Sequence, residues 1–139
     1  MAKIMVVDDE QDLVMLVKMI FKREGHEVIG ATSGEEALEK LKGKKPDLIL
    51  LDIMMPYLDG WGTLELIRKQ DGLKDVPVSM LTAKDLTPEI TARKDIGELV
   101  DYIQKPFTKD SLIKKVNSIL GDLESIAHKK SRLSIEVGD

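Results

Sequence analysis

The sequence predicts an α/β fold of the doubly wound class, with one five-stranded parallel sheet in the order 2-1-3-4-5 and helices on both faces. Short apolar segments and longer amphipathic segments alternate five times along the chain, which is the pattern of (βα)5 proteins. One short segment, residues 47–51, is apolar after its first residue, as is typical of a strand buried on both faces. The length of 139 residues suits a single domain.

The first half of the chain contains three of the predicted strands and two of the helices. The long apolar stretch after the first strand exceeds the length of a strand and suits a largely buried helix that stops near Gly25. Ser33 and Glu36 have the spacing of a capping box, so Ser33 opens the next helix. Strands are expected at residues 3–7, 26–31 and 47–51, and helices at 12–21 and from Ser33 to Gly43.

The second half continues the alternation. Pro77 fits only near the start of a strand, and Thr87-Pro88 combines a helix cap with proline at the first helical position. Trp61 is expected to face the core from the helix that it begins. Helices are expected at residues 61–70, 87–97 and 108–120, and strands at 76–81 and 100–103.

Residues 1–120 are predicted to form the domain, and residues 121–139 a C-terminal tail. The tail either extends the last helix or forms a frayed polar end. Leu133, Ile135 and Val137 alternate with polar residues, which is only a weak strand signal.

Composition narrows the classes of function. The chain has no cysteine, which excludes disulfides, thiol catalysis and cysteine-ligated metal. A net charge of −4 argues against a broad electrostatic footprint for nucleic acid. No apolar run approaches the ~20 residues that span a bilayer. The first residues run straight into a strand pattern and leave no room for a signal peptide, so we expect a cytoplasmic protein.

Polar side chains follow four of the five predicted strands. Asp8 and Asp9 follow the first strand, Asp52 closes the third, and Thr82 and Lys105 follow the fourth and fifth. Because ligands of open parallel sheets bind beyond the carboxyl ends of the strands, these residues are predicted to form one site. Three neighbouring carboxylates repel one another, and a hard divalent cation such as Mg²⁺ relieves that repulsion. A carboxylate is also a nucleophile toward phosphorus, and an aspartyl phosphate needs nearby positive charge and hydrogen-bond donors.

Four segments in order resemble the signature segments of response-regulator receiver domains, the CheY-like domains of two-component signalling. They are VVDDE at residues 6–10, DIMMPYLDGW at 52–61, MLTAK at 80–84 and DYIQKPF at 101–107. The match extends over about residues 3–120, which is nearly the whole chain. The resemblance implies a flavodoxin-like fold and a phosphorylation switch.

The resemblance also implies the metal site. Asp52 would be the phosphoacceptor, and Asp9, Asp52 and the main-chain carbonyl of Met54 would bind Mg²⁺, with Mn²⁺ or Ca²⁺ as substitutes. Asp8 would assist through an ordered water. Met54 flanks the path of the attacking water, and its apolar side chain cannot orient that water, so we expect the phosphoryl group to persist for minutes or longer.

Other residues would bind the phosphoryl group or respond to it. The resemblance implies that Thr82 and Lys105 hold the phosphoryl oxygens, together with the main-chain N–H of Ala83. Tyr102 would be the aromatic switch residue that turns inward when Thr82 moves. The peptide bond before Pro106 would be cis.

We expect a stand-alone response regulator, because the 19 residues after position 120 are too few for an output domain. A histidine kinase or phosphotransfer protein would phosphorylate it, and altered binding to a downstream protein effector would carry the signal. We expect a monomer that binds neither nucleic acid nor a membrane directly. It would not be an enzyme, beyond catalysing its own phosphorylation and dephosphorylation.

Several residues have simpler interpretations. Asp9 is also a candidate cap of the first helix, Thr82 a turn hydroxyl and Tyr102 an ordinary core residue. The methionines are interpreted as core filler and loop packing rather than a partner-binding stripe. These methionines are Met15, Met19, Met54, Met55 and Met80.

Three other functions compete with the switch. A flavodoxin-like electron carrier is disfavoured because Asp8 and Asp9 would repel the flavin phosphate. A phosphatase with a D-x-D motif is disfavoured because Met54 stands where the second acid is needed. A pseudo-receiver would bind partners without phosphorylation, and the complete set of acceptor, metal and lysine residues argues against it.

Overall fold

The computed structural model describes residues 1–83 and 100–121. The chain divides into two compact units, Met1–Phe107 and Thr108–Asp139, and each is described by itself. The helix predicted over residues 87–97 and the tail beyond residue 121 lie outside the described residues.

The first unit contains one parallel sheet with strands in the order β2-β1-β3-β4-β5, which confirms the predicted fold class. Each observed strand begins and ends within two residues of its predicted range. The strands are β1 (Lys3–Val7), β2 (Glu27–Ala31), β3 (Leu48–Asp52), β4 (Val78–Thr82) and β5 (Val100–Gln104).

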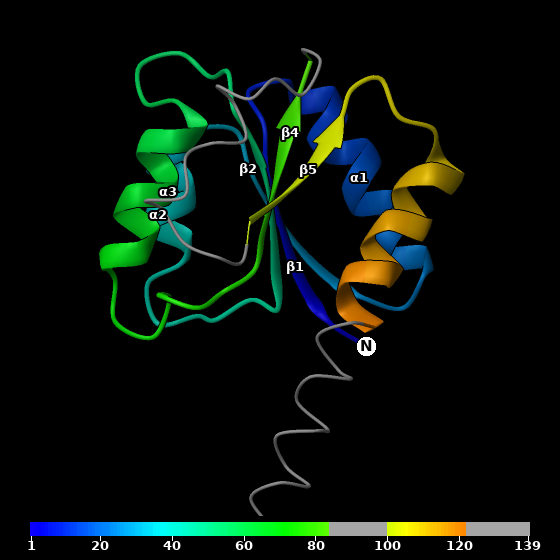
Figure 1. Ribbon diagram of the computed structural model, residues 1–139, viewed down its shortest axis with the longest axis horizontal. Helices are drawn as coiled ribbons and strands as arrows, with labels where there is room; N and C mark the ends of the chain where they lie inside the picture. Colours follow the sequence, from blue (N-terminus) through cyan, green and yellow to red (C-terminus); the bar gives the residue numbers. More distant parts are fainter. Residues whose placement is uncertain (84–99, 122–139) are drawn as a thin grey trace, which may run out of the picture. The chain divides into compact units, whose positions relative to one another are not determined.

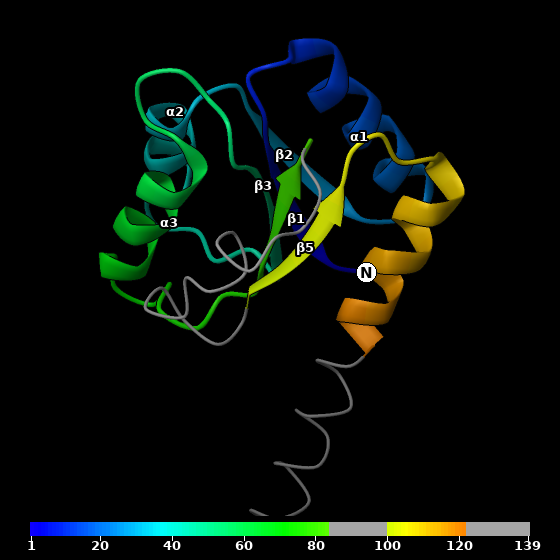
Figure 2. The same ribbon diagram turned by 45° about the horizontal axis from the view of Figure 1, so that its top comes forward.

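Helices cover both faces of this sheet. Helix α1 (Gln11–Arg23) lies on one face, and α2 (Gly34–Lys40) and α3 (Gly60–Lys69) lie together on the other (Figures 1 and 2). All five residues of β3, the central strand, are buried. This explains why β3 is apolar up to Asp52, the residue that ends it.

The main apolar core lies between the sheet and the α2 and α3 face. Trp61, Leu64 and Ile67 of α3 are buried there, and the burial of Trp61 agrees with its expected place in the core. They pack with inward side chains of the central strands, such as Met80 of β4.

The ends of α1 and α2 show which residues start and stop these helices. The Ser33 Oγ accepts a hydrogen bond from the Glu36 N–H at 3.0 Å, which confirms the predicted cap of α2. The Glu36 carboxylate reaches back to the N–H of Thr32 at 3.3 Å, one residue before the cap. Gly25 follows α1 with a φ of 89°, a left-handed conformation that glycine adopts without strain.

Helix α1 differs from the sequence interpretation on its exposed side. Met15 and Met19 are 59% and 51% exposed, so they are not core filler. Its buried side is formed by Val14, Val17, Ile20 and Phe21. Met55 and Met80 are buried as expected.

In the second unit, residues 109–121 are helical. Thr108 and Ser111 cap the start of this helix reciprocally: each main-chain N–H donates to the other's side-chain oxygen at 3.0 Å. This confirms the predicted helix start at Thr108. No helix in the described parts of the chain is long and apolar enough to cross a bilayer.

Candidate functional site

The carboxyl ends of β1 and β3 bring three acidic side chains together. One carboxylate oxygen from each of Asp8, Asp9 and Asp52 lies within 4.8 Å of the other two. Asp8 and Asp52 are buried, whereas Asp9 is exposed. Such a set of oxygen donors, open to solvent on one side, fits a hard divalent cation.

The surroundings of Asp8 and Asp9 distinguish their roles. Asp8 is fully buried, and its Oδ1 accepts a hydrogen bond from the Glu10 N–H at 2.9 Å. The N-cap of α1 is Glu10, and its side chain makes no capping hydrogen bond. Asp9 is therefore not the cap of α1, which removes the simpler interpretation of this residue.

Lys105, just after β5, provides positive charge to the acidic cluster. Its Nζ lies 2.5 Å from Asp8 Oδ2 and 3.6 Å from Asp52 Oδ1. The lysine side chain is only 16% exposed, so water screens these ion pairs weakly. One ammonium group thus contacts two of three carboxylates, and the cluster keeps an excess of negative charge.

The surroundings of Asp52 change its pKa. Burial raises the pKa of the Asp52 carboxyl to about 6, with a further contribution from the charge of Asp8, while Lys105 and the N–H of Met54 act in the opposite direction. Burial also lowers the pKa of Lys105, but its hydrogen bond to Asp8 and the charges of both acids outweigh this, so the lysine pKa is raised. Lys105 therefore stays charged at neutral pH.

Thr82 and Ala83 lie at the end of β4, next to β3. Thr82 is buried, and its main-chain carbonyl accepts a hydrogen bond from the Lys105 N–H at 2.7 Å. Ala83 follows it and is exposed. The peptide bond between Lys105 and Pro106 is cis, as predicted. The ends of β4 and β5 are thus joined directly beside the acidic cluster.

The loop after Asp52 forms another wall of the site. The Met54 N–H lies 3.4 Å from Asp52 Oδ1, and the Met54 side chain is 59% exposed. A cleft of about 450 Å³ lies along this loop, lined by Ile53, Met54, Met55, Pro56 and Asp59. Met54 therefore lines the site on its solvent-exposed side.

Two features of this loop escaped the sequence interpretation. Tyr57 is fully exposed and has a φ of 67°, a left-handed conformation that costs free energy in a residue with a Cβ. Gly60 is pressed against the end of β3: a Cβ there would overlap the Asp52 carbonyl oxygen and lie 2.8 Å from Ile53 Cα. The Asp-Gly pair at 59–60 was a detectable signal, because Asp59 caps α3 through the Gly62 N–H at 2.8 Å.

Tyr102 lies in β5, opposite Met80 of β4. It is partly buried, and its ring packs against Trp61 at the start of α3, with ring centroids 6.3 Å apart. The sequence predicted an inward Trp61 and gave Tyr102 as a switch residue or a core residue, but it could not predict that the two rings meet.

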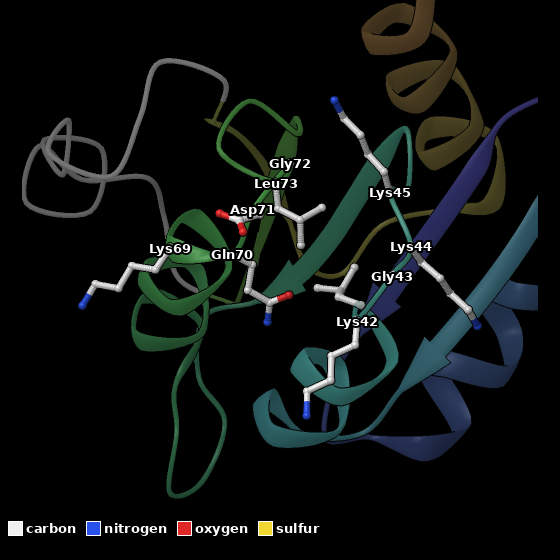
Figure 3. A pocket seen from close by; sticks show the side chains of 10 residues that line it. Lys42, Gly43, Lys44, Lys45, Lys69, Gln70, Asp71, Gly72 and Leu73 are labelled. Atoms are coloured by element: carbon white, nitrogen blue, oxygen red, sulfur yellow. The ribbon is translucent and has the colours of Figure 1, made fainter.

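A larger cavity, of about 550 Å³, lies at the opposite end of the sheet, between the loops that follow α2 and α3. Four lysines line it, but their side chains diverge from one another (Figure 3). Two of them form ion pairs, Lys42 with Glu39 at 2.9 Å and Lys45 with Asp75 at 3.5 Å. This cavity lacks convergent polar groups, so the acidic cluster remains the candidate site despite its smaller cleft.

Comparisons with known proteins agree with this geometry. The family model described as the response regulator receiver domain matches residues 4–117. The chain is 42% identical over 118 residues to the alkaline phosphatase synthesis transcriptional regulatory protein PhoP of Bacillus subtilis, covering 85% of this chain and 48% of that protein. A probable transcriptional regulator, ycf27 of Pyropia yezoensis, is 39% identical over 124 residues, with coverages of 89% and 49%. The chain thus spans about half the length of these curated relatives.

Two solved structures are similar to this chain over almost their full length. The chemotaxis protein CheY4 of Vibrio cholerae has a TM-score of 0.79 at 30% identity, covering 86% of this chain and 98% of that one. The N-terminal domain of a response regulator receiver protein from Methanoculleus marisnigri has a TM-score of 0.69 at 45% identity, with coverages of 86% and 97%.

Proposed function

Because the chain belongs to the family of response regulator receiver domains, we propose that it is a switch that accepts a phosphoryl group on Asp52. The observation that carries the proposal is the buried Asp52 carboxylate at the end of a central strand, beside two further carboxylates and 3.6 Å from the Lys105 ammonium. The pKa of about 6 leaves Asp52 mostly ionised at neutral pH, as a nucleophile must be.

The cofactor in this proposal is Mg²⁺, with Mn²⁺ or Ca²⁺ as substitutes. The carboxylates of Asp9 and Asp52 and the main-chain carbonyl of Met54 would hold it, and Asp8 would act through a water. The cluster supports this assignment because it offers only oxygen donors within a small space. When bound, the ion neutralises charge on the transferring phosphoryl group and lessens the repulsion among the acids.

In the transfer step, an Asp52 carboxylate oxygen attacks phosphorus, and the bond from phosphorus to the donor breaks. The donor would be a histidine kinase, a phosphotransfer protein or a small acyl phosphate. Lys105 would balance charge on the phosphoryl oxygens, because its ammonium already lies between Asp8 and Asp52. The Thr82 hydroxyl and the Ala83 N–H would donate to the same oxygens.

The response would follow from Thr82. Its movement toward the phosphoryl oxygens would favour a different position of the Tyr102 side chain, and so a different outer surface beside β5. Because the Met54 side chain is apolar and exposed, it offers no group to orient an attacking water, and the phosphoryl group would persist for minutes or longer. A half-life of seconds in the isolated phosphoprotein would contradict this part of the proposal.

A mass measurement tests the central step. The full chain is incubated with Mg²⁺ and an acyl phosphate, and we expect a mass increase of one phosphoryl group. The increase is expected to disappear in Asp52→Ala and when the metal is chelated, and to remain in Asp71→Asn, which changes an exposed acid at the other end of the sheet. An unmodified wild-type chain would support the pseudo-receiver, and a coloured protein would support the flavin carrier.

The proposed output is altered binding of a downstream protein. The regulator would be a stand-alone, cytoplasmic monomer that does not bind nucleic acid. It would catalyse only its own phosphorylation and dephosphorylation. The match to nearly all of the chemotaxis protein CheY4 supports this output. The relatives named as transcriptional regulators favour a longer, DNA-binding protein instead. The size of the protein in cell extracts distinguishes the two: a band near 15.5 kDa supports the stand-alone regulator, and one about twice as large contradicts it.

A further inference from the structure

Trp61 and Tyr102 connect two parts of the proposed switch that are far apart in the sequence. Their ring planes are inclined by 59°, a tilted arrangement that is favourable for aromatic pairs. Trp61 is only 8% exposed and is the single tryptophan of the chain. The contact therefore joins the first turn of α3 directly to β5, without passing through Thr82.

On the α3 side, Trp61 is tied to the phosphoacceptor. Its neighbour Gly60 donates its N–H to the Ile53 carbonyl at 2.8 Å, and a Cβ on Gly60 would overlap the Asp52 carbonyl oxygen. Asp59 fixes the same turn, because its carboxylate accepts the Gly62 N–H. The backbone that carries the indole is thus seated on the backbone that carries the phosphoacceptor.

On the β5 side, Tyr102 is tied to the other half of the site. Its N–H, at the outer edge of the sheet, donates to Asp101 Oδ1 at 2.7 Å, which fixes the main chain there. Three residues later, Lys105 donates its N–H to Thr82 and extends its ammonium to the acids. The Tyr102 side chain is partly buried and packs against the apolar core.

We propose that Trp61 is a positioning residue of the switch, whose indole packs against the Tyr102 ring in its inward position and so favours the position that phosphorylation of Asp52 selects. The inference rests on the proposed phosphorylation of Asp52. It gives the switch a second connection from the acceptor strand to β5, in addition to Thr82. An aromatic pair of this kind is worth on the order of fivefold in an equilibrium constant, which is enough to shift the balance between two arrangements of a side chain.

The first experiment measures the contact in the unphosphorylated protein. Urea unfolding of the wild type, Trp61→Leu, Tyr102→Leu and the double variant forms a double-mutant cycle, followed by circular dichroism because the tryptophan is removed. We expect the effects to be non-additive by roughly fivefold in the unfolding constant. If Trp61→Leu does not fold, Trp61→Phe replaces it and the expected coupling is smaller but not zero.

Tyr57 provides a matched control, because it is the other tyrosine of the chain, lies four residues before Trp61 and is fully exposed. A second cycle with Trp61→Leu and Tyr57→Leu is expected to be additive. Additivity in the Tyr102 cycle, or equal coupling in both cycles, would overturn the proposal.

The second experiment separates a switch contact from an ordinary core contact. The emission of Trp61 is recorded in the full chain before and after phosphorylation, with the mass of the same sample as the measure of phosphorylation. We expect a shift to shorter wavelength as the Tyr102 ring covers the indole more fully, and loss of that shift in Tyr102→Leu.

The outcomes of this second experiment are distinguishable. A chain that gains no phosphoryl group refutes the proposed function and this inference with it. A phosphorylated chain with unchanged emission leaves the proposed function intact and overturns the inference alone. A shift that persists in Tyr102→Leu would mean that the indole senses the phosphoryl group without Tyr102, which also overturns the inference.

Discussion

Replacing Asp52 with asparagine should stabilise the metal-free protein at neutral pH. The Asp52 side chain is almost fully buried beside Asp8, and Lys105 offsets the repulsion only in part. Folding therefore costs free energy whenever Asp52 is ionised and no cation is bound. Asparagine has nearly the same shape as protonated aspartic acid and avoids that cost.

The magnitude follows from the pKa. In the folded chain the pKa of Asp52 is raised from 3.8 to about 6, so the native state holds this proton more tightly than the unfolded state. Stability from this group is fully present below about pH 4 and is lost as the pH rises through about 6. A difference of about two pKa units corresponds to about 3 kcal/mol, which is the largest gain expected for Asp52→Asn at pH 7.5.

The assay is urea unfolding with a chelator present, at a series of pH values between 4 and 7.5. The free-energy difference between Asp52→Asn and the wild type should grow over this range and level off near neutrality. Asp71→Asn, which changes an exposed acid, is the control and should show little difference at any pH. A variant that is no more stable than the wild type at pH 7.5, or a difference independent of pH, would refute the reasoning.

Three further substitutions test the packing around the site. Tyr57→Gly should raise the free energy of unfolding by up to about 1 kcal/mol, because it relieves the left-handed φ of 67°. Tyr57→Ala keeps a Cβ and should not raise it. Equal effects of the two variants in urea unfolding would exclude backbone strain as the cause. Gly60→Ala should destabilise the folded protein by about 1–3 kcal/mol and slow phosphorylation measured by mass, because its Cβ would meet the Asp52 backbone. Gly62→Ala should have a milder effect, because its Cβ would meet mainly the Leu58 side chain. A larger effect of Gly62→Ala than of Gly60→Ala would contradict this packing. Ser79→Ala should raise the free energy of unfolding by about 1 kcal/mol, because the buried Ser79 hydroxyl has no hydrogen-bond partner among the described residues. A loss of stability in urea unfolding would show that the hydroxyl does make a hydrogen bond.

Much of the fold could be predicted because its signals are local. The apolar run that ends in Asp52 reflects a strand enclosed on both faces, and the Ser33–Glu36 spacing reflects a cap that forms within one helical turn. The site followed from the same information, because parallel strands end at a common edge. Asp8, at the end of β1, and Lys105, after β5, meet there.

Features that depend on contacts between distant elements could not be predicted. The contact of Trp61 with Tyr102 depends on where α3 lies against the sheet, which no local spacing encodes. Met15 and Met19 were misassigned because α1 is apolar on more than one side, and periodicity alone does not show which side the sheet covers. The strain at Tyr57 is a property of the loop conformation rather than of residue type.

The position of the phosphoryl group tests the central claim most directly. Borohydride reduces an aspartyl phosphate to homoserine, so reduction of the phosphorylated chain followed by peptide mass mapping identifies the acceptor. The account predicts homoserine at position 52 and at no other acid of the cluster. Homoserine in place of Asp8 or Asp9, or none anywhere in a chain that has gained a phosphoryl group, would contradict it.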